Sequence, residues 1–419
     1  MINNDKWWTY LVVLAAVSVA VGFMLFLEFC FENGLATYLN TRSFSSVNAN
    51  PLAAFIYSLP DPIWIGIQIV GLIVISLGIG ALTFEVTKKY KLLAALTATV
   101  TPSVFFWVPS ATGEIPLLAT SAWGMLFLVK YINSGQRFHA VVAGALFAMA
   151  LASRGTLILF PVAGLSILII TKMLLEKKSF GYALRFSGIP FAIPLLFVLG
   201  MSAHNYSSTG YWYWSSQSGT HLLQWVYPCL KNRYGCGIRD MSLVNELKQE
   251  LALKMAAEGI KGSDIGAKNQ LQKSIAWERL HQEEKLSLVI AGLSSYVKIL
   301  VYSPVRLMLG SQGIVQGALW NSSVDLGAQE GSREWRRVGL TIAEVINLML
   351  LIIQGCGLIV LLANKNTREI DILFGIFIVA VLATGLGIGN PRYSAVTLVV
   401  FIPLFFVGVA FLKGRLRNH

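Results

Sequence analysis

Long apolar segments separated by short polar ones run through most of this 419-residue chain. A helix that crosses a bilayer needs about 20 mainly apolar residues, and in lipid each backbone group must be hydrogen-bonded inside the segment. On this basis the pattern predicts about ten transmembrane helices. They lie at residues 8–28, 63–84, 92–107, 117–132, 140–153, 156–171, 188–203, 340–362, 371–388 and 395–412. The predicted fold class is therefore an all-α polytopic membrane protein.

The first apolar run, from Trp7 to Leu27, follows a single lysine and has no small-residue cleavage pattern. We therefore interpret it as a retained span and not as a removable signal peptide. Several later spans are shorter than a perpendicular helix requires. We expect these spans to extend into their flanks or to end below the membrane surface beside a cavity.

Basic residues are distributed unevenly between the two sides of the predicted helices. With the N-terminus inside, the short outer connections hold only Arg42, Arg154 and Arg392. The inner side holds Lys6, Lys88, Lys89, Lys91, Lys130, Arg137, Lys172, Lys177, Lys178, Arg185, Lys365, Arg368, Lys413, Arg415 and Arg417. Such an excess of Lys and Arg is typical of cytoplasmic loops. We therefore predict an integral protein of the bacterial inner membrane with both termini in the cytoplasm.

The pattern divides the chain into three parts. Residues 1–203 form an N-terminal transmembrane module of about seven spans with a first outer loop at 29–62, and residues 340–419 form a C-terminal module of about three spans. Between them, residues 204–339 form a large extracytoplasmic loop. Its segment 241–285 has apolar residues at helical spacing, and 286–320 is apolar but interrupted by charges, proline and glycines. We expect amphipathic helices at the membrane surface there, or alternatively one more pair of spans.

Composition agrees with lipid as the surrounding solvent. Hydrophobic residues make up 55% of the chain and charged residues only 13%, which is more apolar side chain than a soluble core of this length can bury. The net charge of +12 then reflects membrane topology and anionic lipid, and not nucleic acid. Cys229 and Cys236 lie in the long polar segment, where they could form a small disulfide loop or stay as unpaired thiols.

Three acidic residues at the outer ends of spans are candidates for catalysis. Glu28 and Glu32 are four residues apart, so a helix would place both carboxylates on one face. One of them could act as a general base, or both could be interfacial caps that face water. Glu114 precedes Pro116, as in the first turn of a helix, where the helix dipole also favours an acid for structural reasons alone.

Two arginines lie on the outer side, against the usual distribution. Arg154 and Arg392 each lie between two closely spaced apolar segments, where a guanidinium can bind a phosphate through two hydrogen bonds or can extend to the interface. The aromatic and hydroxyl-rich segment that begins at His204-Asn205-Tyr206 suits either a sugar or an aromatic belt. Metal-ligand spacings and soluble-type hydrolase or nucleotide-binding motifs are absent from the sequence.

Taken in order, these features resemble the GT-C superfamily of polyprenyl-phosphate-dependent glycosyltransferases. The resemblance is greatest to the branch with protein O-mannosyltransferases and lipid A aminoarabinose transferases, and it covers about residues 8–210 and 371–412. Besides the acid after the first span, it rests on four short motifs. These are Thr112-Gly113-Glu114-Ile115-Pro116, Leu151-Ala152-Ser153-Arg154-Gly155-Thr156, His204-Asn205-Tyr206 and Asn390-Pro391-Arg392-Tyr393.

The resemblance implies transfer of a sugar from a polyprenyl-phosphate donor to an acceptor hydroxyl at the outer face, with inversion. Glu28 would be the base and Glu32 the other candidate, because many members have an Asp or an Asp-Glu pair there and this chain has two glutamates. Glu114 would orient the acceptor or the sugar. The remaining candidates bind the donor phosphate (Arg154, Arg392, Tyr393) or the substrates (Arg42, His204, Asn205, Tyr206).

The expected partners are the lipid-linked donor, membrane lipid and a glycan, lipid or protein acceptor. No cofactor is expected; a divalent metal is used by some members but is not favoured here, because acids are sparse in the short outer connections. The alternatives are a secondary transporter or lipid flippase, a polymerase or ligase of lipid-linked glycans, and a noncatalytic assembly factor. A transporter would carry its polar residues near mid-span on broken helices, whereas here they lie at span ends.

Overall fold

The computed structural model describes residues 4–30, 59–101, 113–215, 217–231, 241–301, 368–384 and 392–417, with a few isolated positions between them. Every regular element in these ranges is a helix. Before the long loop they are α1 (Asn4–Cys30), α5 (Asp61–Thr87), α6 (Lys91–Val100), α8 (Glu114–Ser134), α9 (Arg137–Ser153), η1 (Gly155–Leu157), α10 (Phe160–Leu174) and α11 (Phe180–Thr209). After it they are α12 (Ser218–His221), η2 (Leu222–Val226), α13 (Tyr227–Lys231), α14 (Met241–Ala257), α15 (Ile265–Gln282), α16 (Lys285–Val301), α19 (Arg368–Thr384) and α20 (Arg392–Arg417).

The all-helical, membrane-type fold expected from the sequence is confirmed in these ranges. Four helices are long and apolar enough to cross a membrane, at Pro62–Thr87, Glu114–Ser134, Gly155–Leu174 and Phe180–Thr209. Shorter apolar helices cover most of the other predicted spans. Most of the predicted span 340–362 lies outside the described residues, so the count of ten stays a prediction.

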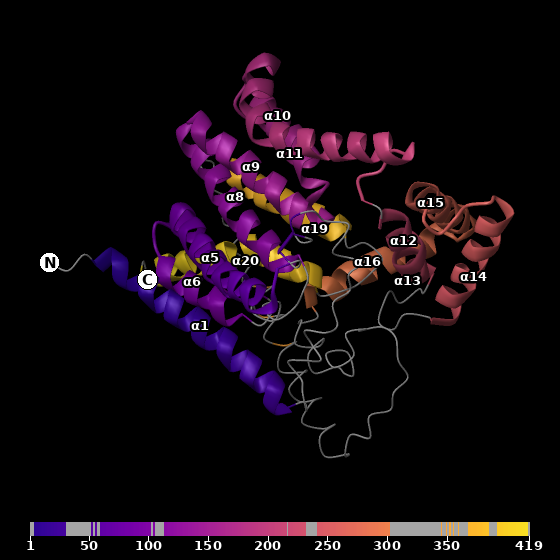
Figure 1. Cartoon of the computed structure of the whole chain (residues 1–419). Coiled ribbons are helices and arrows are strands. Elements are labelled where there is room, and N and C mark those ends of the chain that lie inside the picture. The colour runs from indigo at the N-terminus through magenta and orange to yellow at the C-terminus, as the bar shows by residue number, and fades with distance from the viewer. Residues whose placement is uncertain are drawn as a thin grey trace.

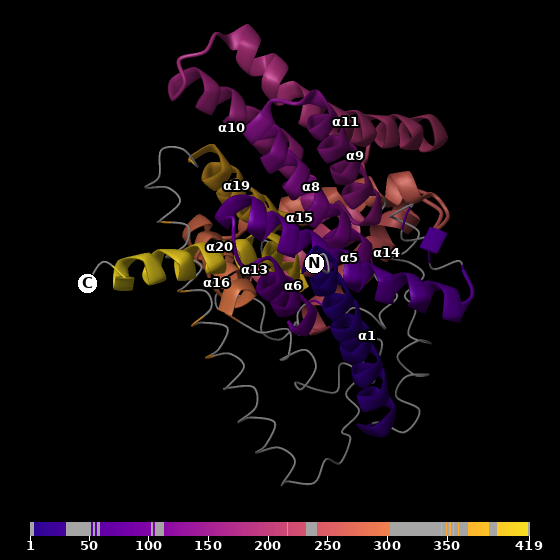
Figure 2. The same cartoon turned by 90° about the vertical axis from the view of Figure 1, so that its left-hand side faces the viewer.

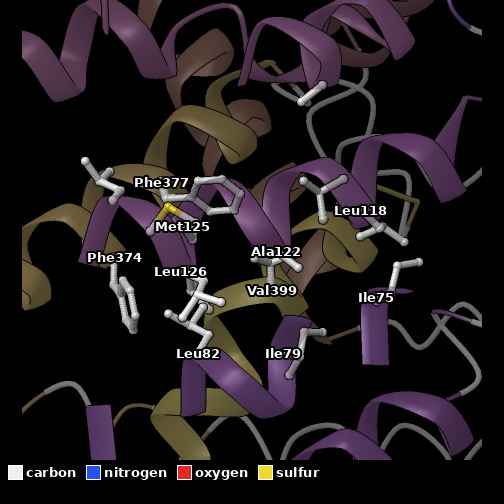
Figure 3. Close-up of a cluster of buried hydrophobic side chains, with 14 of the residues drawn as sticks. Ile75, Ile79, Leu82, Leu118, Ala122, Met125, Leu126, Phe374, Phe377 and Val399 are labelled. Atoms are coloured by element: carbon white, nitrogen blue, oxygen red, sulfur yellow. The ribbon is translucent and has the colours of Figure 1, made fainter. Parts of the chain in front are cut away.

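Four of the helices pack around one apolar core. Figure 3 shows side chains of α5, α8, α19 and α20 converging, among them Ile75, Leu118, Phe377 and Val399, which are all fully buried or nearly so. The two C-terminal helices therefore complete a bundle that begins in the N-terminal half. Seen from the end where α1 begins, α1 crosses in front of this bundle and packs on α5 and α6 (Figure 2).

A cluster of phenylalanines joins the remaining helices to this core. Phe160 lies at the start of α10. Its ring centroid is 5.0 Å from that of Phe147 on α9, 5.7 Å from that of Phe191 on α11 and 5.1 Å from that of Phe377 on α19. All three contacts are edge-to-face, which is a favoured geometry for aromatic pairs. The cluster fixes α9, α10, α11 and α19 relative to one another.

The two ends of the bundle differ in charge. Helix α1 begins and α20 ends at the same end, opposite the group α12–α15 (Figure 1). At that end Lys413 of α20 lies over the ring of Tyr90, and Asn133 in the last turn of α8 donates to Glu85 of α5. The lysines of the turn between α5 and α6 and Lys413 therefore lie at this end, whereas Glu114, in the first turn of α8, and its partner Arg154 lie at the other end of α8.

Helices α12 to α16 form a second, smaller unit on the side of the bundle opposite the start of α1 and the end of α20 (Figure 1). Leu247, Leu271 and Ile275 belong to its buried apolar cluster, which is separate from the core of the bundle. The predicted helical segment 241–285 thus corresponds to α14 and α15, and the apolar part of 286–320 that the structure describes belongs to α16.

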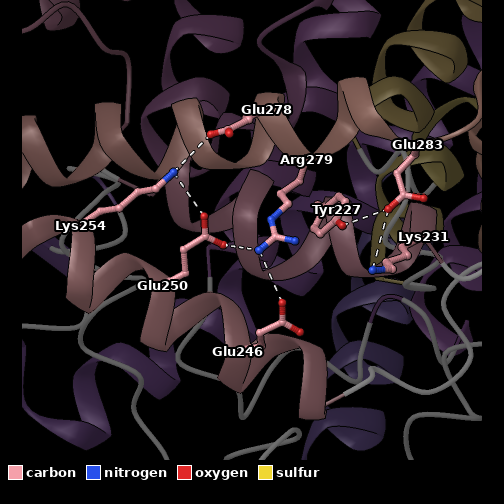
Figure 4. Close-up of polar contacts among 8 residues, drawn as sticks. All are labelled: Tyr227, Lys231, Glu246, Glu250, Lys254, Glu278, Arg279 and Glu283. Atoms are coloured by element: carbon pink, nitrogen blue, oxygen red, sulfur yellow. Dashed lines mark hydrogen bonds and ion pairs between the residues drawn. The ribbon is translucent and has the colours of Figure 1, made fainter.

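Charged side chains join α14 to α15 across this unit (Figure 4). Arg279 donates to Glu250 at 2.7 Å, and Lys254 lies 3.2 Å from both Glu250 and Glu278. Burial raises the pKa of Glu250, but the hydrogen bonds from Arg279 and Lys254 outweigh it, so that its pKa is lowered overall. The network therefore stabilises the ionised form of this carboxylate.

Candidate functional site

Glu114 is placed by the start of α8. Gly113 precedes it, and Pro116 occupies the first helical turn, where its missing N–H costs no hydrogen bond. An acid at this end of a helix is stabilised by the helix dipole. The Glu114 side chain is 1% exposed, so its charge must be compensated inside the protein.

Arg154 supplies that compensation. It directly follows α9, with an extended backbone whose N–H donates to Ala150 O at 3.0 Å. Its Nη1 donates to Oε1 of Glu114 and forms a salt bridge with it. The Arg154 side chain is 21% exposed, whereas its partner is buried. Arg154 is thus paired with Glu114, a contact that the sequence did not predict.

The segment after α11 packs against the arginine turn. A Cβ atom at Gly155 would lie 3.0 Å from Nε1 of Trp214, so Trp214 packs tightly on this glycine and would have to shift slightly for a larger residue. The Nε1 atom is buried and has no hydrogen-bond partner among the residues that the structure describes. Asn205 of α11 holds this segment by donating to the carbonyl of Tyr213 at 2.8 Å. Trp214 is therefore a neighbour of the site that sequence reasoning left unassigned.

Helix α11 extends beyond the predicted span 188–203 and includes the three predicted substrate residues. It continues through Thr209, where Gly210 closes it with a φ of 75° and donates to Tyr206 O. His204, Asn205 and Tyr206 therefore lie on its last turns and not in a loop. Asn205 has the positioning role described above, but His204 and Tyr206 are exposed. The structure therefore does not bring His204 or Tyr206 into the Glu114–Arg154 pair.

Helix α19, which precedes the candidate Arg392, contacts the segment that follows Arg154. The hydroxyl of Thr384, at the end of α19, donates to Thr156 O at 2.9 Å, two residues beyond Arg154. Arg392 and Tyr393 begin the next helix, α20, and the structure describes their backbone only. Helix α19 therefore contacts both η1, which follows Arg154, and α20, which begins with Arg392.

Other predicted residues fall partly or wholly beyond the described part of the chain. Glu28 lies in the last turn of α1, with its side chain undescribed; Glu32 and Arg42 lie outside the described residues. Cys229 is disulfide-bonded, whereas Cys236 lies outside the described residues, so their pairing stays a prediction. Within the described ranges there is no group of three or more His, Cys, Asp or Glu that could hold a metal ion.

Two further buried residues on α5 lie at the level of Glu114. A Cβ on Gly71 would meet Ile115, the residue after Glu114, and Gln68 lies one turn closer to the N-terminal end of α5. Gln68 and Trp64 are both fully buried. The sequence could have indicated Gln68 and Trp64 through the glutamine inside an apolar run, because amides are costly in a membrane unless they are hydrogen-bonded.

As a whole, the site presents a buried carboxylate fixed to a partly exposed guanidinium. A guanidinium carries several N–H donors, so it can bind a carboxylate and a phosphate at the same time. The carboxylate holds the cation in one orientation at a place where water is scarce. Such an arrangement suits an anionic group that develops or departs beside Arg154.

Comparison with known families agrees with this chemistry. The profile of the dolichyl-phosphate-mannose-protein mannosyltransferase family matches residues 53–198, which include Glu114, Arg154 and most of the membrane bundle. No curated protein matches the chain significantly. The resemblance inferred from the sequence motifs is thus confirmed over the part that holds the ion pair. Over residues 53–198 this chain is similar to the dolichyl-phosphate-mannose-protein mannosyltransferase family, which consists of membrane glycosyltransferases of the GT-C type.

Proposed function

We propose that the protein transfers a sugar from a polyprenyl-phosphate donor to an acceptor hydroxyl at the extracytoplasmic face, with inversion at the anomeric carbon. The observation that carries this proposal is the Glu114–Arg154 pair, which lies inside the family match and at the end of α8 opposite Lys413 and the turn between α5 and α6. A phosphate-linked donor leaves an anion behind, and the proposed site offers a cation there. Given the family, polyprenyl-phosphate mannose is the first donor to test.

In the proposed reaction, Glu28 removes the proton of the acceptor hydroxyl, with Glu32 as the alternative base. The acceptor oxygen forms a bond to the anomeric carbon while the bond from that carbon to the phosphate oxygen breaks. The electron pair of this bond leaves with the polyprenyl phosphate. Because the transition state resembles an oxocarbenium ion, stabilising the departing phosphate lowers the barrier.

The other candidates then have distinct roles. Arg154, Arg392 and Tyr393 bind the departing phosphate, and Glu114 holds Arg154 in place and orients the sugar or the acceptor. Arg42, His204, Asn205 and Tyr206 contact the substrates. Both termini lie in the cytoplasm and the membrane is the bacterial inner membrane, so the donor lipid reaches the site from the outer leaflet.

The test uses the full chain in lipid nanodiscs with labelled polyprenyl-phosphate mannose and other polyprenyl-phosphate sugars. Glu28→Gln should abolish release of polyprenyl phosphate while donor binding stays close to wild type, because only the proton acceptor is lost. Glu85→Gln is the matched control and should stay active, because Glu85 lies in the last turn of α5, beside the end of α8 that is opposite Glu114. Full activity of Glu28→Gln would reject this residue as the base and direct the same experiment to Glu32.

The wild-type protein also decides between the main alternatives. A flippase would move the labelled lipid across a proteoliposome membrane without breaking the phosphate–sugar bond. A glycan polymerase or ligase would consume a lipid diphosphate and not a lipid monophosphate. Either result, without cleavage of any polyprenyl-phosphate sugar, would reject the proposed transfer.

A further inference from the structure

One face of α15 carries a row of residues suited to ligand binding. Gly266, Gln270, Lys273 and Trp277 follow one another at intervals of four, three and four residues, so they share one side of the helix. Seven residues of helix separate Gln270 from Trp277, which corresponds to about 10 Å. The row is therefore long enough to contact more than one pyranose ring.

The segment after α11 continues this row at one end. A Cβ on Gly266 would lie 2.6 Å from Cδ2 of Tyr211, and Gln270 Nε2 lies 3.4 Å from the carbonyl oxygen of Trp212, to which it donates. The rings of Trp212 and Tyr206 are stacked with centroids 5.3 Å apart, and they are 55% and 48% exposed. We call Tyr206, Trp212, Gln270, Lys273 and Trp277 together the aromatic face.

The other sides of α15 are already occupied. Asn269 accepts a hydrogen bond from the backbone N–H of Gly219 at 2.6 Å, and Gln272 accepts one from Thr220 at 3.1 Å, which places α12 on one flank. Ion pairs of Arg279 and Glu278 hold α14 on another (Figure 4). The aromatic face is therefore left pointing away from both neighbours, and Trp277 is 55% exposed.

The chemistry of the face is mixed in a way that suits a carbohydrate. Aromatic rings stack on the apolar faces of pyranoses, while an amide and an ammonium hydrogen-bond to the hydroxyls at their edges. Burial lowers the pKa of Lys273, and no ion pair or hydrogen bond of its side chain occurs among the described residues. An oxygen-rich ligand would replace the water that this lysine has lost.

A lipid surface fits the face less well. The helix beneath it carries many polar residues outside its buried apolar side, including Asn269, Gln272, Glu278 and Arg279. The face also continues toward the ion pair, because Trp212 lies two residues before Trp214, whose ring rests on Gly155 beside Arg154. The segment that carries Trp212 of the aromatic face therefore also contacts the turn that follows Arg154.

We propose that the aromatic face binds an oligosaccharide chain of the acceptor. The proposal rests on the proposed function in identifying the bound sugar as the acceptor. It identifies the acceptor as a carbohydrate, whereas the family resemblance allows a glycan, a lipid or a protein acceptor. The rings would hold successive sugars, while Gln270 and Lys273 would hydrogen-bond to them.

Binding is tested first, without donor, on the full chain in nanodiscs exposed to a printed array of neutral and acidic oligosaccharides. Trp212→Ala and Trp277→Ala should each weaken retention of the best-bound glycan about two- to tenfold, the range expected for a lost ring contact. Trp277→Phe should restore most of it. Trp7→Ala, an exposed tryptophan on α1, is the matched control and should bind like wild type.

Two outcomes would overturn the proposal: no array glycan retained by the wild type, or equal retention by the Trp212 and Trp277 variants. Binding of these variants to anionic lipid vesicles in place of glycans is measured in parallel. A ring-dependent loss of vesicle binding alone would show an interfacial role and would also overturn it.

A transfer assay separates this proposal from the proposed function. If the variants raise the KM for a glycan acceptor and leave kcat nearly unchanged, both stand. If transfer proceeds with an unchanged acceptor KM, the aromatic face is not the acceptor site although the proposed function holds. If glycan binding depends on the rings but no polyprenyl-phosphate sugar is cleaved, the binding face stands and the proposed transfer fails.

Discussion

The Glu114–Arg154 pair allows structural and functional roles to be separated by substitution. Arg154→Gln leaves the Glu114 carboxylate without its cation, at a position where the side chain is 1% exposed. Breaking a buried ion pair from one side costs about 3–5 kcal/mol, because the remaining charge is neither paired nor hydrated. Glu114→Gln should cost less, because the 21% exposed guanidinium can still reach water.

The double variant Glu114→Gln/Arg154→Gln removes both charges. Replacing both members of a buried pair is often nearly neutral, so it should be more stable than Arg154→Gln alone. Unfolding is followed by thermal shift in one detergent at one protein concentration, and transfer from polyprenyl-phosphate mannose is measured on the same samples. If Arg154 binds the leaving phosphate, activity should stay lost although stability returns.

Two results would refute this reasoning. Wild-type stability of Arg154→Gln would show that the pair contributes nothing to folding. Recovery of activity together with stability in the double variant would show that the pair only braces α8 against the end of α9. Additive effects of the two single substitutions would also contradict a direct contact, since residues in one ion pair should be coupled.

Three further predictions can be tested separately. Arg392→Ala should weaken donor binding with little change in thermal stability, and unchanged affinity for the labelled donor would exclude this residue from the phosphate site. Because the pKa of Glu250 is lowered in the folded state, its stabilising contribution is present above its ordinary value of 4.5 and is lost as the pH falls through the lowered value. Glu250→Gln should flatten that acid dependence of unfolding, and an unchanged pH profile would contradict it. A cysteine at Gln217 should react with an impermeant reagent added outside intact cells and one at Lys178 should not; the reverse pattern would overturn the proposed orientation.

Much of the site could be anticipated from local sequence. Glu114 and Arg154 stand out because charge in an apolar chain is costly, and both were assigned to the outer side from the distribution of lysine and arginine. Their contact could not be read from the sequence. It depends on α8 starting and α9 ending at the same level, forty residues apart in the chain, which only the packing of the two helices fixes.

Trp214 and the aromatic face show the same limit. Aromatic density after α11 was visible, but it suited a membrane belt as well as a sugar. The contacts of Trp214 with Gly155 and of Trp212 with Gln270 join segments that the sequence pattern treats independently. Which aromatic residue lies beside the arginine and which remains exposed is a matter of three-dimensional packing.

The sequence by itself determined that the chain is an all-helical membrane protein, that its helices fall near the predicted apolar runs, and that it resembles the GT-C glycosyltransferases. These properties follow from the cost of unpaired backbone groups and charges in lipid, which each segment must satisfy locally. Only the tertiary structure decided that Glu114 pairs with Arg154, that α11 carries His204 to Tyr206 on its last turns, and that one side of α15 stays open. Those features depend on contacts between residues distant in the chain, and hydropathy carries no information about which helix faces which.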